Sequence, residues 1–370
     1  PWAALEMSFS VAEKWRSHTP TDLLKGVALM GAKKSKGLML LAAFPEASRD
    51  ATESLPVLLY PEGLPEAHDP HYKCTVLTDS FTHKTYVHCL TIPCLAGADS
   101  SSPLVLVLWT HVSDLIFFRQ LLRALHATYF ESPPKVTTEW AVLAESVFSL
   151  VIWVTTSALA PPAGCSTVLH LSPGATEGPL VLRAPAGGLM HCSVPMRVLL
   201  LAFKLDDLVN IFRLLLLERK VLLIASSAEL LTFVCEALLA SIFPFAWSHS
   251  YNPMIPHIDL RESPSPFLFG CLRQIWDSSP SPPDVWIFDL EKGCELTPGT
   301  GGREEWREVG DEPPDLPELA RGSLQCSLQA AGAELGDAGI SAMLERDTEQ
   351  DNRIQACFLT FMELLLPDHQ

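Results

Sequence analysis

The chain has 370 residues, of which 48% are hydrophobic, and its mean hydropathy is +0.21. This length and composition predict two or three folded domains with a large core and exclude a mostly disordered protein. The formal net charge of −17 argues against a nucleic-acid backbone as partner and against simple adsorption to an anionic lipid surface, because like charges repel. A partner that presents basic patches is compatible with this charge.

The ten cysteines are spread singly, without a C-x-x-C pair, and the sequence contains no N-glycosylation sequon. This usage is typical of reduced thiols in a cytosolic protein. No secretory signal is visible at the start, so we expect a cytoplasmic location. The chain opens with proline and not methionine, which is compatible with a fragment of a longer protein.

The N-terminal part is expected to form a small antiparallel sheet followed by a helix. Val27 to Phe44 holds two apolar runs around a basic turn. The runs Lys73 to Thr78 and Thr85 to Leu90 predict two strands joined as a hairpin. Leu104 to Trp109 predicts a further strand. Val112 to Tyr129 has apolar residues at helical spacing along one side, so we expect an amphipathic helix there.

The apolar stretch Ala141 to Ala160 is nearly long enough to span a bilayer. It carries Glu145 and several hydroxyl groups, and no cluster of Lys or Arg flanks it. We therefore expect a buried or lobe-connecting helix that does not span a membrane. Residues 161–190 are dense in Pro and Gly, which predicts an irregular linker with one short strand at Leu180 to Leu182.

The central stretch predicts a helix, a buried strand and a second helix. Asp207 to Leu217 has helical spacing, and Val221 to Ala225 is a short unbroken apolar run typical of a strand that is buried on both faces. Ser226 and Glu229 have the spacing of a capping box, so Ser226 is expected to cap the second helix. That helix should run to Phe243 and end before the following proline.

Two further strands are expected beyond this block, at Pro266 to Leu272 and Val285 to Leu290. Gly299 to Pro317 is acidic and loop-like, and Asp347 to Leu366 predicts a final helix. The whole pattern indicates a mixed α/β protein, with an antiparallel sheet in the N-terminal lobe and an α/β arrangement in the C-terminal lobe.

The sequence contains no recognisable site for covalent chemistry. The turn Gly31 to Gly37 lacks the Gly-Lys-Ser/Thr ending of a phosphate-binding loop, and Ser226 lacks the flanking glycines of a nucleophile elbow. The densest metal-ligand cluster is His88, Cys89 and Cys94, without the paired spacing of a zinc site. We therefore expect no catalytic residue, no metal and no cofactor, and a protein that works by recognition.

Several segments resemble the DENN domain family of Rab guanine-nucleotide exchange factors. Leu215 to Pro256 resembles the core signature, with a Leu-Glu-Arg-Lys turn at Leu217 to Lys220 and the sequence FPFAW at Phe243 to Trp247. Pro264 to Gly270 and Asp284 to Gly293 are similar to the elements that follow it in the family.

The resemblance extends to both flanks. Lys73 to Leu90 and Leu104 to Tyr129 resemble the upstream module, and Asn352 to Leu366 resembles the downstream one. The downstream module is expected to be incomplete and less stable. The resemblance implies an N-terminal longin-like lobe and a C-terminal DENN lobe, divided as 1–130 upstream, 131–190 linker, 191–310 core and 311–370 downstream.

The implied function is to promote GDP release from a Rab small GTPase in membrane trafficking, without covalent chemistry. The protein would be recruited peripherally to vesicle or endosomal membranes and would bind no nucleic acid. Tyr251, Asn252 and His257 are hypothetical partner contacts, because they lie on the loop expected after the central helix, where the two lobes are expected to face each other. The alternative is a non-catalytic adaptor or a subunit of a GTPase-activating complex, for which Arg261 or Arg273 would be the available arginine.

Overall fold

The structure is a computed structural model. It describes residues 19–33, 37–45, 56, 59–60, 69–79, 83–93, 103–128, 140–171, 178–184, 194–255, 266–277, 285–295, 314–333 and 348–366. The chain divides into two compact units. The first consists of Pro1–Leu77 and Lys84–Leu189, and the second of Thr78–His83 and Met190–Gln370.

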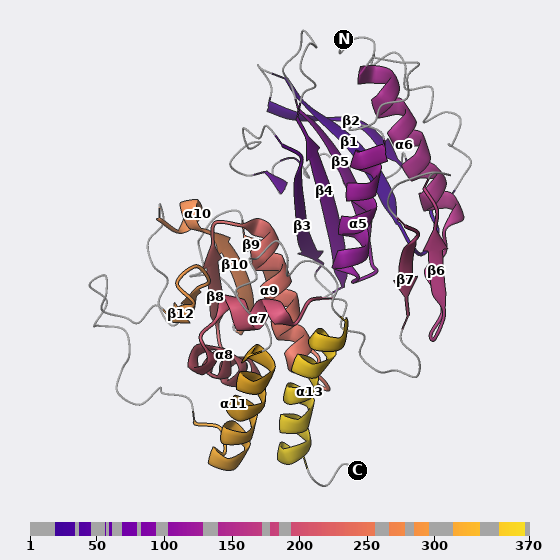
Figure 1. Ribbon diagram of the computed structural model, residues 1–370. Helices are drawn as coiled ribbons and strands as arrows, with labels where there is room; N and C mark the ends of the chain where they lie inside the picture. Colours follow the sequence, from indigo (N-terminus) through magenta and orange to yellow (C-terminus); the bar gives the residue numbers. More distant parts are fainter. Residues whose placement is uncertain are drawn as a thin grey trace. The chain divides into compact units, whose positions relative to one another are not determined.

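A five-stranded sheet forms the centre of the first unit (Figure 1). The spatial order is β2-β1-β5-β4-β3, and the pairs β1–β2, β1–β5 and β4–β5 are antiparallel. The antiparallel N-terminal sheet predicted from the sequence is thus confirmed. The strands are β1 (Gly26–Lys33), β2 (Gly37–Phe44), β3 (His71–Thr78), β4 (Lys84–Ile92) and β5 (Leu104–Thr110).

Two helices pack on this sheet: α5 (Leu115–His126) contacts β4, and α6 (Trp140–Ser157) contacts β1. The side chain of Asp114 accepts a hydrogen bond from the amide of Phe117 at 2.9 Å. This cap explains why α5 begins later than the predicted Val112. Among the described residues, no helix has the length and apolar composition needed to cross a membrane, α6 included.

The predicted linker carries more structure than its composition indicated. Strands β6 (Ser166–Leu169) and β7 (Leu180–Arg183) pair antiparallel as a separate two-stranded sheet. Only the second of these strands was predicted. The first begins just after Gly164, which adopts a left-handed φ of 77°, so the glycine that marked a break in the sequence turns the chain into a strand.

The second unit contains a mainly parallel sheet in the order β12-β11-β8-β10-β9. Strand β8 pairs in parallel with both β10 and β11, and β10 pairs in parallel with β9. Because β8 lies inside the sheet, all five of its residues are buried. The strands are β8 (Val221–Ala225), β9 (Ser250–Ile255), β10 (Phe267–Leu272), β11 (Trp286–Asp289) and β12 (Cys294–Glu295).

Helix α9 (Ala228–Ser241) contacts β8, β9 and β10 and is buried over most of its circumference. The predicted cap is wrong by one position. The hydroxyl of Ser227, not Ser226, accepts the hydrogen bond from the amide of Leu230 at 3.2 Å. The backbone of Ser226 still belongs to the strand end, where its amide donates to Glu291, so the helix begins one residue later.

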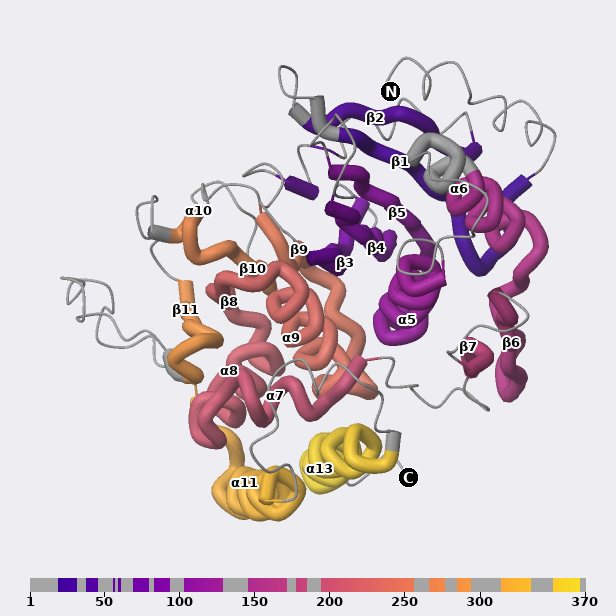
Figure 2. Tube along the Cα trace, turned by 45° about the horizontal axis from the view of Figure 1, so that its top comes forward, coloured from indigo at the N-terminus to yellow at the C-terminus, as the bar shows by residue number. Residues whose placement is uncertain are grey.

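The remaining helices of this unit are α7 (Arg197–Ala202), α8 (Leu205–Leu216), α10 (Arg273–Asp277), α11 (Glu318–Ala333) and α13 (Thr348–Leu365). Helices α11 and α13 lie side by side (Figure 2) and contact α8 and α9 respectively. The ring of Phe212 on α8 packs against Phe358 and Phe361 of α13, with ring centroids 5.0 and 5.3 Å apart. The final helix is therefore part of the core of the second unit.

Candidate functional site

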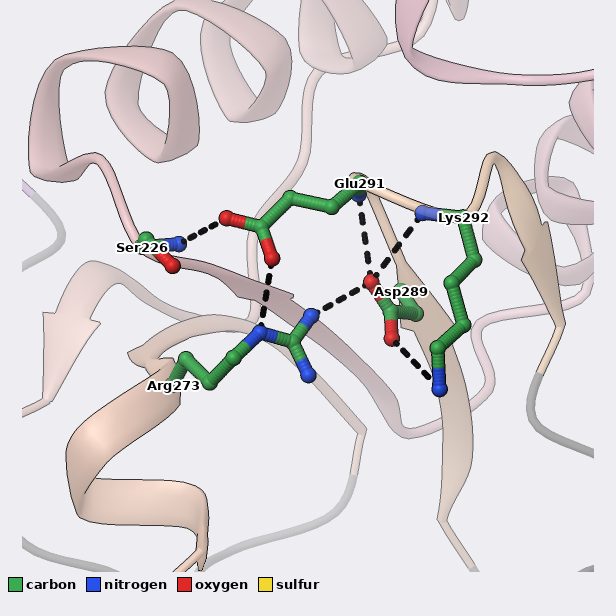
Figure 3. A network of polar contacts seen from close by, with 5 residues as sticks. All are labelled: Ser226, Arg273, Asp289, Glu291 and Lys292. Atoms are coloured by element: carbon green, nitrogen blue, oxygen red, sulfur yellow. Dashed lines mark hydrogen bonds and ion pairs between the residues drawn. The ribbon is translucent and has the colours of Figure 1, made fainter.

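The carboxyl edge of the parallel sheet gathers polar side chains from three strand ends (Figure 3). Ser226 and Arg273 directly follow β8 and β10, and Asp289 is the last residue of β11. Parallel strands bring their carboxyl ends to one edge of a sheet, and in α/β proteins binding sites are usually found there. This edge is therefore the first candidate for a functional site.

Asp289 lies at the centre of this network and is fully buried. Its Oδ1 accepts hydrogen bonds from Nη2 of Arg273 at 2.5 Å and from the amides of Glu291 and Lys292 at 3.1 and 3.3 Å. Its Oδ2 forms an ion pair with Nζ of Lys292 at 3.5 Å. A buried carboxylate is tolerated only with such compensation. Asp289 thus holds the turn that ends β11.

Glu291 connects this turn to the other two strands. Its Oε2 accepts from Nε of Arg273 at 2.7 Å, and its Oε1 accepts from the amide of Ser226 at 2.9 Å. Hydrogen bonding from Ser226, followed by the Arg273 guanidinium, lowers the pKa of Glu291. Burial opposes the charge of Arg273, but its hydrogen bonds to Asp289 and Glu291 outweigh that effect and raise the pKa of Arg273.

The network is self-compensated and suits a structural role. It contains two carboxylates and two cations, and the guanidinium of Arg273 is engaged by both carboxylates. Arg273 is therefore held in place, which disfavours its use as an arginine that reaches into a partner. Arg261 lies outside the described residues. What the arrangement can do is fix the ends of three strands in one geometry.

Two of the three hypothetical contact residues occupy an edge strand and not a loop. Tyr251 and Asn252 belong to β9, at the edge of the sheet, so the expected loop is wrong at these two positions. Tyr251 is buried, and its hydroxyl donates to Oε1 of the buried Glu236 on α9 at 2.5 Å. This bond joins the edge strand to the helix behind it. His257 lies outside the described residues.

Asn252 stabilises an irregularity in β9. The register with β10 shifts here, because Asn252 pairs with Phe269 and the next pair is Ile255 with Cys271. Pro253 has no amide hydrogen, and the amide of Met254 donates instead to Oδ1 of Asn252 at 3.0 Å. Proline is tolerated in an edge strand at such a bulge.

The bulge also requires a glycine on the neighbouring strand. A Cβ on Gly270 of β10 would lie 2.1 Å from the carbonyl oxygen of Pro253, so only glycine allows this approach. The two contact candidates are therefore fixed in position by packing and hydrogen bonds.

The structure describes two members of the cluster His88, Cys89 and Cys94, and both are buried in the core. His88 is buried, its Nδ1 lies 2.7 Å from the hydroxyl of Tyr72, and its ring packs against Phe118. Burial lowers the pKa of His88 to about 3 and raises the pKa of the Cys89 thiol to about 12. Cys94 lies outside the described residues, and the described part of the chain contains no group of three potential metal ligands.

A known family model matches the part of the chain that contains this network and strand β9. The model of the DENN (AEX-3) domain matches residues 101–293, more than half of the chain. The chain belongs to the DENN domain family. The match includes β5 to β11 and the whole Arg273–Asp289–Glu291 network.

Curated relatives are similar over shorter stretches. DENN domain-containing protein 2A of Homo sapiens is 48% identical over 67 residues, which is 18% of this chain and 7% of the relative. DENN domain-containing protein 2B of Mus musculus is 31% identical over 159 residues, which is 42% of this chain and 13% of the relative. DENN domain-containing protein 2D of Mus musculus is 31% identical over 130 residues, 34% of this chain and 25% of the relative. In each case the matched region spans a quarter of the relative's length or less.

Proposed function

We propose that the chain promotes GDP release from a Rab-family small GTPase. Membership of the DENN family across residues 101–293 carries this proposal, since the family resemblance implies exchange activity. The two units would act as the longin-like and DENN lobes. Within them, 1–130 would be the upstream module, 191–310 the core and 311–370 the downstream module. Peripheral recruitment to vesicle or endosomal membranes belongs to the same proposal.

Exchange of this kind is an effect of differential binding. A factor accelerates GDP release when it binds the nucleotide-free GTPase more tightly than the GDP-bound form, and no bond in the protein needs to form or break. A rigid surface suits this task, because it does not spend binding free energy on ordering itself. The fixed strand ends of the Arg273 network and the pinned edge strand β9 support such a surface.

The negative charge of the chain is consistent with a basic partner surface. A net charge of −17 would accelerate encounter with a positively charged patch and would make the association rate depend on salt. Among the residues that the structure describes, the candidate arginine for a GTPase-activating role, Arg273, is engaged by Asp289 and Glu291. This favours exchange over the GTPase-activating alternative.

The test is a panel of Rab GTPases loaded with a fluorescent GDP analogue and mixed with the whole chain. The proposal expects faster release for at least one Rab, with a rate proportional to the chain concentration at low concentration. No acceleration for any Rab would overturn it. Faster GTP hydrolysis without faster GDP release would support the activating alternative instead.

The contact hypothesis needs variants that keep the fold. Tyr251→Phe removes only the hydroxyl, which donates a hydrogen bond to Glu236, so the ring stays packed. His257→Ala and Asn252→Asp test the other two candidates, since aspartate keeps an oxygen that can accept from the amide of Met254. If exchange is unchanged in the triple variant while its urea unfolding remains cooperative, these three residues are not contacts.

A further inference from the structure

A cleft of about 250 Å³ lies in the second unit beside α8 and α11. Helix α8 lines it with Asp206, Asn210 and Arg213, which share one face because they are four and three residues apart. The opposite side is lined by Asp315, from the segment before α11, and by Arg321 in the first part of α11. Four charged side chains thus meet around one small space.

Two of these charges compensate each other. Nη1 of Arg213 donates to Oδ1 of Asp315, and its Nη2 donates to Oδ1 of Asn210 at 2.8 Å. The Arg213 side chain is 13% exposed, whereas Asp315 is 72% exposed. This pair attaches the segment before α11 to α8 and has its charge balanced within the protein.

The other two charges are not balanced. Asp206 accepts a hydrogen bond from the neutral amide Nε2 of Gln325 at 2.9 Å, and among the described residues no cation pairs with it. The guanidinium of Arg321 has no acceptor within that part of the chain, and it does not form an ion pair with Asp206. One carboxylate and one guanidinium therefore line the same cleft without meeting.

We propose that this cleft binds a small zwitterion of the α-amino acid class. The ligand carboxylate would accept from Arg321, in the charge-assisted geometry that guanidinium groups favour. The ligand ammonium would donate to Asp206, whose Oδ2 is not used by Gln325. A ligand with a single charge is disfavoured, because an anion meets the unbalanced carboxylate of Asp206 and a cation meets the unbalanced guanidinium of Arg321.

The size and the apolar lining of the cleft limit the choice of ligand further. The volume is below the range of about 300 to 1,000 Å³ that is typical of sites for drug-sized molecules, so the ligand is small. Val209 and Leu316 also line the cleft, and they provide an apolar surface for an aliphatic side chain. Leucine and valine are the amino acids that these features favour. The proposal is independent of any exchange activity.

The experiment titrates the whole chain with L-leucine by isothermal titration calorimetry. Two matched analogues are titrated beside it: 4-methylpentanoate, which lacks the ammonium group, and isoamylamine, which lacks the carboxylate. Each lost charge-assisted contact is expected to weaken binding about tenfold or more. Equal affinity for leucine and 4-methylpentanoate would reduce the cleft to a simple anion site and overturn the proposal, as would no binding of leucine.

Three variants locate the ligand. Asp206→Asn and Arg321→Gln should each weaken leucine binding about tenfold, and both replace a charged side chain with a neutral polar one at positions that are not buried. Arg353→Gln serves as the matched control, because Arg353 is a half-exposed arginine of α13 that pairs with Glu349 and does not line the cleft. Equal weakening in the control, or unchanged binding in both cleft variants, would place the ligand elsewhere. Urea unfolding of each variant confirms that the fold persists.

Discussion

Asp351 of α13 accepts two hydrogen bonds from Arg197 of α7 through one carboxylate oxygen. The backbone amide of Arg197 lies 3.1 Å from Oδ1, and its guanidinium Nε lies 3.3 Å from the same atom. The side chain of Arg197 is only 9% exposed and that of Asp351 only 6%, and the two residues are 154 positions apart in the sequence. The last described helix is therefore joined to the first helix of the second unit by a buried, charged contact.

Replacing Asp351 with alanine would leave the Arg197 guanidinium buried without this carboxylate. We expect the free energy of unfolding to fall by about 3 to 5 kcal/mol, the usual cost of breaking a buried ion pair from one side. Urea unfolding of the whole chain measures it. The control is Glu349→Ala, since Glu349 is 78% exposed in its pair with Arg353 and should cost under about 0.5 kcal/mol. Similar losses in the two variants would contradict a special role for Asp351.

The Arg273 network predicts an unequal effect of its two cations. Arg273→Ala leaves the fully buried Asp289 with Lys292 as its remaining side-chain cation, so we expect a loss of about 3 kcal/mol in unfolding free energy. Lys292→Ala removes a side chain that is 64% exposed and 3.5 Å from the carboxylate, and should cost about 1 kcal/mol or less. Arg273→Lys should recover only part of the loss, because lysine cannot engage both Asp289 and Glu291 in the same fork. An equal cost for the two alanine variants would refute this account.

Part of the fold could be predicted because local pattern and tertiary environment agree. Val221 to Ala225 is apolar throughout and lies between two parallel strands, so composition and burial indicate the same element. Strand β9 was missed for the opposite reason. Asn252 and Pro253 mark a loop by their local preferences, but an edge position and the glycine at 270 make a bulged strand acceptable. Helix α11 was not predicted either. It buries only Ala320, Leu324 and Leu328, and three buried positions give a weak periodic pattern in the sequence.

The polar network could not be predicted from spacing. Arg273 meets Asp289 across 16 residues, and Ser226 meets Glu291 across 65. Sequence distance carries no information on which cation will face which carboxylate. The available signal was the position of charged residues directly after apolar strand candidates, since parallel strands bring such positions to one edge. The candidate contacts at Tyr251 and Asn252 depended on an expected loop, and tertiary packing decided otherwise.

His88 predicts a specific loss of stability in acid. Burial lowers its pKa to about 3 in the folded protein, against about 6.5 in an unfolded chain. Between these pH values the unfolded state binds a proton that the folded state does not. The contribution of neutral His88 to the free energy of unfolding is therefore complete above about pH 6.5 and declines as the pH falls toward 3. The slope is about 1.4 kcal/mol per pH unit within this window.

The measurement for His88 is urea unfolding at a series of pH values, for the parent chain and for His88→Phe. The variant should lose this part of the acid sensitivity, because phenylalanine does not titrate. His83→Phe is the control, since the imidazole of His83 is 75% exposed and its replacement removes a surface histidine instead of a buried one. Parallel profiles for the parent and His88→Phe would show that buried His88 does not govern the acid response.

Two glycines of the second unit should respond to alanine with opposite signs. At position 270 the new Cβ would lie 2.1 Å from the carbonyl oxygen of Pro253 and 2.8 Å from its carbonyl carbon. Backbone atoms cannot move aside as a flexible side chain can, so β9 and β10 must separate, at a cost of about 3 kcal/mol or more. Gly322 lies inside α11 with nothing within 4 Å of the added atom. Gly322→Ala should therefore raise the free energy of unfolding by up to about 1 kcal/mol through helix propensity. Urea unfolding of the two single variants measures both effects, and stabilisation by Gly270→Ala would mean that the close approach of Pro253 does not hold the edge strand in place.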